Sequence, residues 1–231
     1  MAPPLPSYLR RLPSGLVVRS MAPGDADALE ALQLDVFPTL ADAQRFKAAH
    51  YRRHLELFAP GQFVVEDAGR IVAATSTVRR HVDFDHPHHT FDDIIQGGWL
   101  TSHELGGDWL YGADLGVHPA YRGRGLALAL YAARQQLVWT LGLRGQVSAG
   151  MMSGYGAVKH LMSAADYLTG VNAGRINDPT LSMQLRIGFT ARALLPNHLD
   201  DPSCDNTSVL IVLDAAREVS GADRTSARPA P

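Results

Sequence analysis

The chain has 231 residues, of which 46% are hydrophobic and 19% charged, with 21 Lys and Arg residues against 23 Asp and Glu residues. These values are typical of a globular protein long enough to bury one sizeable core. The net charge of −2 lacks the basic excess of proteins that bind nucleic acids or acidic membrane surfaces, so we expect neither as a partner.

Apolar runs and cysteine usage predict the compartment. The longest apolar runs, such as residues 126–133, are short, whereas a membrane-spanning helix needs about 20 apolar residues. Prolines interrupt the N-terminal stretch where a secretion signal needs a continuous apolar run. Cys204 is the only cysteine, which excludes an internal disulfide and a zinc site built from cysteines. We therefore expect a cytoplasmic protein with Cys204 exposed among polar neighbours.

Both ends of the chain lack the hydrophobic periodicity of packed elements. Residues 1–14 are rich in Pro and Arg, and residues 216–231 show no apolar pattern, so both are predicted to be flexible tails. No repeat and no Gly/Ser-rich linker divides residues 15–215. A single domain is therefore predicted over residues 15–215.

Within that domain, hydrophobic spacing and turn residues predict the elements. In chain order we expect a strand at 16–19, helices at 25–37 and 41–58, a hairpin of 62–66 and 70–79, a long connection at 81–108, a strand at 109–117, a helix at 125–141, a strand at 145–151, a helix at 157–173, a short helix from 178 that ends before 188, and strands at 189–195 and 207–213. Strands and helices alternate only in the second half, which indicates an α/β (α+β) fold with a mixed sheet and helices on both faces.

The most informative stretch is residues 109–130, a strand followed by a turn and an apolar helix. Gly123 and Gly125 allow close backbone approach, and the free N–H groups of the first helical turn attract an anion. Arg122 and Arg124 add charges suited to phosphate. The stretch is neither a P-loop nor a dinucleotide fingerprint, since Leu128 replaces the third glycine. It predicts a pyrophosphate site, although a glycine-rich turn with surface arginines explains these residues equally well.

A family resemblance favours the pyrophosphate site. Arg122-x-x-Gly125-x-Ala127, preceded by Val117-His118-Pro119-x-Tyr121, resembles the acyl-CoA-binding motif Q/R-x-x-G-x-G/A of the GNAT N-acetyltransferase superfamily. Gly188-Phe189 resembles its second conserved region. The stretches DPTLSMQLRIGF and LLPNHLDD are similar to a GNAT branch often found fused to carbon-nitrogen hydrolases. The resemblance covers residues 16–213.

This resemblance implies a central, mostly antiparallel sheet that splays between the strands at 109–117 and 145–151. Acetyl-CoA would be the cosubstrate and would enter the splay, with its pyrophosphate on the amides before the long helix. Asn177 would contact pantetheine, or else it is a turn residue ahead of Asp178. The residues that the resemblance assigns to acetyl-CoA are Leu115, Gly116, Val117, Arg122, Gly123, Arg124, Gly125, Leu126, Ala127 and Asn177.

The implied reaction is direct transfer of the acetyl group to a small amine in a ternary complex. The Val117 N–H would polarise the thioester carbonyl, as in an oxyanion hole. Many relatives protonate the departing thiolate with a Tyr four residues before the Gly-Phe pair, but this chain has Gln184 there, which does not titrate. A non-catalytic acyl-CoA-binding module on a degenerate GNAT fold is therefore the alternative function.

Candidate catalytic side chains follow from the same resemblance. Tyr155 and Tyr167 could replace the missing acid, or could be packing residues. For the base, some relatives use the position of Tyr111, whose ordinary pKa of about 10 suits a base poorly. Asp114 is the better base, but strict strand alternation places it on the opposite face from Tyr111 unless the strand is bulged. A structural carboxylate is the competing interpretation of Asp114.

The connection before the central strand carries unusual charge. Its histidines and aspartates at 81–89 lack the spacing of a metal site, and no metal is expected. Residues 81–121 contain no Lys or Arg but seven acidic residues. If this segment lies at the acceptor site, its field favours a cationic amine, whereas a solvated acidic loop is the simpler interpretation. The resemblance also allows a homodimer, since homodimers are common in the superfamily.

Overall fold

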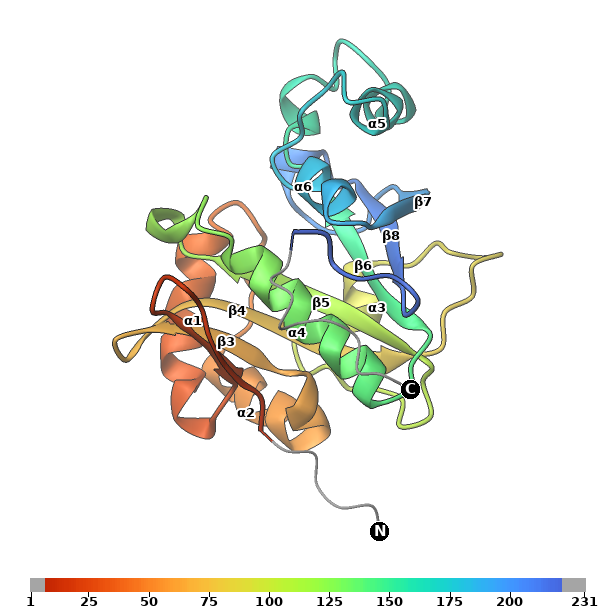
Figure 1. Ribbon diagram of the computed structural model, residues 1–231. Helices are drawn as coiled ribbons and strands as arrows, with labels where there is room; N and C mark the ends of the chain where they lie inside the picture. The colour runs from red at the N-terminus through yellow and green to blue at the C-terminus, as the bar shows by residue number, and fades with distance from the viewer. Residues whose placement is uncertain (1–6, 222–231) are drawn as a thin grey trace.

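An eight-stranded sheet with the order β1-β2-β3-β4-β5-β6-β8-β7 forms the centre of the molecule (Figure 1). The structure, a computed structural model, describes residues 7–221. The strands are β1 (Leu9–Arg11), β2 (Val17–Ser20), β3 (Phe63–Asp67), β4 (Arg70–Arg80), β5 (Trp109–Val117), β6 (Gly145–Met151), β7 (Thr190–Leu195) and β8 (Ser208–Asp214). All neighbours pair antiparallel except β5 and β6, which pair parallel. The predicted mixed, mostly antiparallel sheet is confirmed.

Helices cover both faces of the sheet (Figure 1). They are α1 (Ala26–Val36), α2 (Ala48–Phe58), α3 (Phe91–Ile95), α4 (Leu126–Thr140), α5 (Ala164–Asn172) and α6 (Leu181–Arg186). The apolar stripe of α4, with Leu126, Leu130 and Leu137, packs in one core cluster with β2, β3 and β4. Leu29 and Tyr51 of α1 and α2 belong to the core cluster of the opposite face. The two cores hold the strands of the site between them.

The sheet splays open in its middle, between β5 and β6. The two strands pair at only three positions, from Leu110 opposite Gln146 to Gly112 opposite Ser148. Beyond them, β5 continues on β4 as far as Val117, and β6 continues on β8 as far as Met151. Figure 1 shows β6 leading away from β5 towards α5 and α6. The predicted splay is confirmed.

A β-bulge interrupts β5 just where the splay begins. Ser76 and Thr77 are consecutive on β4, but they pair with Asp114 and Gly112, so Ala113 is an extra residue. A bulge reverses the inward and outward alternation of the residues after it. Tyr111 and Asp114 therefore share one face of the sheet, as the bulged alternative predicted.

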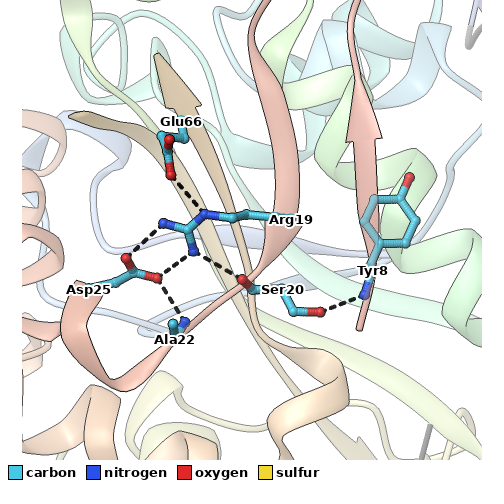
Figure 2. A network of polar contacts seen from close by, with 6 residues as sticks. All are labelled: Tyr8, Arg19, Ser20, Ala22, Asp25 and Glu66. Carbon is cyan, nitrogen blue, oxygen red and sulfur yellow. Dashed lines mark hydrogen bonds and ion pairs between the residues drawn. The ribbon is translucent and has the colours of Figure 1, made fainter. Parts of the chain in front are cut away.

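The N-terminal residues differ from the predicted tail. Leu9–Arg11 form β1, an edge strand on β2, because Tyr8 donates its N–H to the Ser20 hydroxyl at 2.8 Å. Figure 2 shows that Arg19 of β2 forms ion pairs with Asp25 (2.7 Å), just before α1, and with Glu66 of β3 (2.8 Å). Burial alone would raise the pKa of Asp25, but the Arg19 and Ala22 hydrogen bonds outweigh it and hold that pKa below its usual range. Residues 1–6 lie outside the described range.

The start of the predicted C-terminal tail is also packed. Val219 is buried, and the Ser220 N–H donates to the Ile187 carbonyl at 2.9 Å. On α4, Gln135 donates to the Arg217 carbonyl at 2.8 Å. These bonds are made at single positions rather than along a repeating face, which explains why the sequence shows no periodicity there. Residues 222–231 lie outside the described range.

Three predicted helices begin later than expected. The short helix predicted from 178 starts at Leu181, where the Asp178 carboxylate accepts the N–H groups of Thr180 and Leu181. Residues 41–47 are not part of α2, which starts at Ala48 after a short turn at Asp42–Gln44. The helix expected at 157–173 starts at Ala164, where the Ser163 hydroxyl caps it by accepting the Asp166 N–H. The long connection at 81–108 contains the short helix α3.

Cys204 and the lengths of the helices bear on two further predictions. Cys204 is fully buried rather than exposed, and burial raises its thiol pKa to about 12. The turn at Pro202–Cys204, capped by the Asp201 carboxylate, directs the thiol inwards. Among residues 7–221, no helix is both long enough and apolar enough to cross a bilayer.

Candidate active site

The predicted pyrophosphate site is an exposed turn that leads into α4. Gly123 and Gly125 have φ angles of +73° and +77°, in the left-handed region that favours glycine. Among residues 7–221, no atom would lie within 4 Å of a Cβ at either position, so the described part of the chain leaves this backbone open. Gly125 is the N-cap of α4, whose first-turn N–H groups lack helical partners. The turn therefore offers N–H groups to an anion.

Side chains hold this turn in place. The Tyr121 hydroxyl donates to the Asp67 carboxylate at 2.8 Å, which anchors the turn to the end of β3. The Arg122 Nε donates to the Val117 carbonyl at 3.3 Å. The guanidinium of Arg124 lies 4.8 Å from the centre of the Tyr121 ring. The two exposed arginines thus flank the N-terminus of α4, where they would favour phosphate.

A cavity of about 150 Å³ lies in the splay between β5 and β6. Its wall comes from α1, α3, β5, α4, β6, α6 and β8 and from the loops between them, and these elements are far apart in the chain. Leu115 of β5 is part of the wall, and the stretch of β5 after Gly112 has a partner strand on one side only. The cavity is mainly apolar, and the polar side chains in its wall include Gln33, Tyr111, Asp114, Tyr131, Arg134, Gln184 and His198.

Asp114 is the acidic side chain of this cavity. One carboxylate oxygen accepts the Gln33 amide at 2.6 Å, and the other accepts the Ser76 N–H at 3.0 Å. Burial raises the pKa of Asp114 to about 6, although these two bonds and the charge of Arg134 pull it down. A carboxylate with such a pKa in a cavity can accept a proton near neutral pH.

Tyr111 and two histidines form a second polar group. The Tyr111 hydroxyl lies 2.6 Å from Nε2 of His89, whose Nδ1 donates to the Pro87 carbonyl at 2.8 Å, so Nε2 accepts the phenolic proton. Burial raises the pKa of Tyr111. His198 lines the cavity, donates from Nδ1 to the His89 carbonyl at 2.9 Å, and has a pKa lowered by burial to about 4. These groups are neutral at physiological pH.

Arg134 of α4 lies beneath the start of the splay, and its side chain is 1% exposed. It donates to the Thr75 hydroxyl, to the Asp114 carbonyl and, at 3.4 Å, to the Ser148 hydroxyl. Its Nε has no partner. Gly112 leaves room for it, because a Cβ there would lie 2.2 Å from Nη1. The guanidinium therefore joins the bulged part of β5 to β6.

Residues 26–150, more than half of the chain, match the Acetyltransferase (GNAT) family. The chain belongs to the GNAT acetyltransferase family. The match contains both β5 and the turn at Arg122–Ala127, so the recognised motif and the splay are parts of one GNAT domain.

Two proteins of Bacillus subtilis (strain 168) are similar to most of the chain. The probable hydrolase YhcX is 35% identical over 193 residues, which make up 84% of this chain but only 37% of YhcX. The uncharacterized N-acetyltransferase YkwB is 28% identical over 197 residues, which make up 85% of this chain and 87% of YkwB. A partial match to a protein named as a hydrolase is compatible with the resemblance to a hydrolase-fused GNAT branch.

Solved structures share the fold. The loading GNATL domain of CurA from Lyngbya majuscula has a TM-score of 0.73 at 18% identity, covering 87% of this chain and 98% of that one. The GphF GNAT-like decarboxylase in complex with isobutyryl-CoA has a TM-score of 0.68 at 23% identity, covering 86% and 98%. YncA from Salmonella typhimurium, with its cofactor acetyl-CoA, has a TM-score of 0.50 at 16% identity, covering 90% and 98%. These likenesses confirm the GNAT-like fold.

Not every residue assigned from the GNAT resemblance lies at the cavity. Tyr155 and Tyr167 are buried outside its wall, where their hydroxyls donate to the Met162 carbonyl (3.4 Å) and to the Asp178 carboxylate (2.9 Å). Asn177 is exposed and accepts a hydrogen bond from Arg186 at 3.4 Å. Tyr111 and Asp114, in contrast, line the cavity together.

Gln184, at the position where many GNAT relatives carry the acid, is buried in the cavity wall. Its Nε2 donates to the Tyr131 hydroxyl at 2.8 Å, while its Oε1 has no partner. Sequence reasoning missed Gln33, Tyr131, Arg134 and His198. A single arginine inside the apolar stretch 126–139 was the one available signal, since an arginine on a buried helix needs a polar partner.

Proposed function

We propose that the protein transfers the acetyl group of acetyl-CoA to a small amine by direct attack in a ternary complex. The observation that carries the proposal is a carboxylate with a raised pKa, Asp114, in a cavity that opens along the unpaired side of β5. The turn at Arg122–Ala127 suits the pyrophosphate, since its backbone is open and two arginines flank it. The same strand thus connects a binding site for CoA with a proton acceptor.

The residues would share the chemistry as follows. The backbone from Leu115 to Val117 would hold the pantetheine arm, and the Val117 N–H would polarise the thioester carbonyl. The amine nitrogen attacks the carbonyl carbon, the carbon–sulfur bond breaks, and the thiolate leaves with the electron pair. Asp114 would accept the proton that the amine loses. Gln33 and the Ser76 N–H would keep the carboxylate turned in one direction.

The acceptor would be a small, cationic amine such as a polyamine. Asp92 lies near the cavity, since Gln44 of the cavity wall donates to it at 3.4 Å. Other acidic side chains of residues 81–121 are already occupied: Glu104 pairs with Arg80, and Asp108 pairs with Arg144. The proposal therefore rests on Asp92 and Asp114 rather than on the whole acidic segment.

Thermal unfolding with acetyl-CoA and desulfo-CoA tests the cosubstrate. Ligand at about 100 times its Kd should add about 2.7 kcal/mol of apparent stability. The double variant Arg122→Ala with Gly125→Glu should lose this gain and stay folded, because the added side chain meets no described atom and the left-handed backbone at Gly125 costs it only about 1 to 2 kcal/mol. Arg53→Ala with Gly142→Glu changes the same residue types elsewhere, at a half-buried arginine and at a glycine that is also left-handed and open, and should keep the gain. No stabilisation of the wild type at millimolar ligand would refute the cosubstrate.

Release of CoA from acetyl-CoA in the presence of spermidine, putrescine and glycinamide tests the transfer itself. Release that depends on the amine, with acetylated amine found by mass spectrometry, supports the enzyme. Binding of acetyl-CoA without release for any amine supports the alternative, a non-catalytic acyl-CoA-binding module.

A second candidate is decarboxylation of a short dicarboxylic acyl-CoA such as malonyl-CoA. Arg134 favours it, because a buried guanidinium with an unpartnered Nε in the cavity wall could attract the substrate carboxylate. The carbon–carbon bond would break, CO₂ would leave, and the α-carbon would take up a proton. This reaction expels no thiolate, so Gln184 in place of the usual Tyr would be no loss. Formation of acetyl-CoA from malonyl-CoA without any amine would favour this activity over transfer.

A further inference from the structure

Tyr131 of α4 has a hydroxyl proton that no described group accepts. The residue is 3% exposed, and its side chain lines the cavity. Nε2 of Gln184 donates a hydrogen bond to the Tyr131 hydroxyl oxygen at 2.8 Å, so this bond does not use the hydrogen of the hydroxyl itself. Among residues 7–221, no acceptor takes that hydrogen. A buried O–H without an acceptor is expected to serve a ligand or a reaction.

The surroundings of Tyr131 fix the ring beside the cavity. Phe189 packs edge-on against it with 5.1 Å between ring centres, and the Arg134 guanidinium lies 5.2 Å from its centre. Tyr131 follows Leu126, the first residue of α4, by five positions, or about 7.5 Å along the helix axis. Tyr131 is therefore little more than one helical turn from the start of α4, and it lines the same cavity as Asp114.

We propose that Tyr131 is the catalytic acid that protonates the departing CoA thiolate, and that Gln184 is its positioning residue. This inference rests on the proposed N-acetyl transfer. As the carbon–sulfur bond breaks and sulfur takes the electron pair, the Tyr131 O–H bond breaks and its proton passes to sulfur. A proton from solvent restores the phenol, and the proton lost by the amine leaves through Asp114. The sum is amine plus acetyl-CoA giving amide plus CoA.

Three other tyrosines near the site donate their protons to described groups, and Tyr51, whose hydroxyl accepts from Gln33 at 2.7 Å, lies outside the cavity wall. The Tyr155 proton goes to the Met162 carbonyl, the Tyr167 proton to Asp178, and the Tyr111 proton to His89. Burial raises the pKa of Tyr131, so the phenol keeps its proton at neutral pH, while Arg134 favours the tyrosinate that forms when the proton leaves. The amide of Gln184 leaves the phenolic hydrogen free, whereas a carboxylate at that position would accept it.

The decisive experiment compares two acetyl donors on Tyr131→Phe with spermidine, putrescine and glycinamide as acceptors. With acetyl-CoA, kcat should fall about 100-fold, the usual order for loss of a general acid. With p-nitrophenyl acetate, whose phenolate leaves without a proton, the rate should change less than twofold. Tyr8→Phe, on the distant N-terminal edge, is the matched control and should behave as wild type with both donors.

Gln184 is tested separately by its own substitutions. Gln184→Glu should lower kcat with acetyl-CoA but not with p-nitrophenyl acetate, because the carboxylate accepts the phenolic proton. Gln184→Met keeps the volume and should cause a smaller loss. Stabilisation by acetyl-CoA in thermal unfolding shows that each variant is folded and binds. An active Gln184→Glu would remove the positioning role.

Each outcome decides between the two proposals. Full activity of Tyr131→Phe with acetyl-CoA, or equal losses with both donors, overturns Tyr131 as the acid while N-acetyl transfer stands. A wild type that transfers from neither donor overturns the proposed function and the assignment of Tyr131 with it. Loss in Tyr155→Phe, with Tyr131→Phe active, would assign the acid to Tyr155.

Discussion

The two halves of the candidate site are built in different ways. The proposed pyrophosphate turn is six consecutive residues, Arg122–Ala127, which would act through backbone N–H groups and exposed arginines. The cavity takes its residues from seven helices and strands and the loops between them, which span residues 33–208. A local motif is a property of the sequence, whereas a cavity is a property of the packing. The first could therefore be recognised before the fold was known, and the second could not.

The two halves should also respond differently to substitution. A Cβ at Gly123 or Gly125 meets nothing within 4 Å, whereas a Cβ at Gly112 would lie 2.2 Å from Arg134 and one at Gly116 would lie 2.8 Å from Val36. Changes in the turn should thus alter binding and leave the fold intact. Changes at the cavity should alter the fold, the chemistry or both.

The largest expected effect is at Gly112. In Gly112→Ala the new methyl group must displace the Arg134 guanidinium from the floor of the splay. Overpacking usually costs about 1 to 3 kcal/mol, and a displaced buried charge adds to it, so we expect a loss of at least about 3 kcal/mol in the free energy of unfolding. Urea denaturation measures it. Gly24→Ala, which meets open space, should change stability by less than about 0.5 kcal/mol; equal stabilities would show that the floor is not tightly packed.

The next largest effect is expected at Asp114, where a substitution should lower the reaction rate while the protein stays folded. Asp114→Asn should lower kcat about 100-fold, because the amide cannot accept a proton. In the wild type, kcat should rise with pH through about 6 as the carboxyl ionises, and this rise should vanish in the variant. Rates between pH 5 and 8 with a saturating amine check both statements. An unchanged profile in the variant would assign the base to another group.

The pH dependence of stability should also differ between the wild type and Asp114→Asn. The folded pKa of Asp114, about 6, is above its usual value of about 4, so the folded chain binds the proton more tightly than the unfolded chain. The wild type therefore loses stability as pH rises between these values, and Asp114→Asn should not. Thermal unfolding at pH 4 and pH 7 measures this difference.

Particular residues show what sequence could and could not predict. The strand Gly145–Met151 agrees with its predicted bounds, because two glycine-containing turns limit an apolar run. The motif at Arg122–Ala127 lies at the start of a helix, as expected. Asp114 was left open, since its face depends on one extra residue at Ala113, and strand alternation contains no information about a bulge. The face on which Asp114 lies therefore could not be predicted from the sequence, and its role as a base stays a proposal.

Tyr131 and Arg134 show a different limit. Both lie on a helix that was interpreted from its apolar stripe, and both point away from that stripe towards the splay. Their partners, Gln184 and Thr75, are 53 and 59 positions away in the chain. No local pattern connects such pairs. The edge strand β1 (Leu9–Arg11) was not predicted for a related reason. It is stabilised by bonds to β2 rather than by its own sequence.

A smaller effect is expected at Gln33, in the cavity wall. Gln33→Leu removes the hydrogen bond that lowers the pKa of Asp114. The midpoint of the rise in kcat should therefore move to a higher pH while the plateau rate at high pH changes little. Gln136→Leu, on α4 outside the cavity wall, is the control and should keep the wild-type midpoint. A midpoint that moves to lower pH would mean that Gln33 stabilises the protonated carboxyl.

The smallest effect concerns the charge at the cavity mouth. Asp92→Asn should raise the KM for spermidine about twofold, since an exposed charge pair contributes about 0.2 to 1 kcal/mol. The KM for a neutral acceptor such as hydroxylamine should not change. Salt should reduce the difference because it screens exposed charges. Asp27→Asn, an exposed aspartate on α1 that pairs with Arg52, should leave both KM values unchanged. Equal KM values for spermidine in Asp92→Asn and wild type would leave Asp114 as the group that selects a cationic acceptor, and would place selectivity wholly inside the cavity.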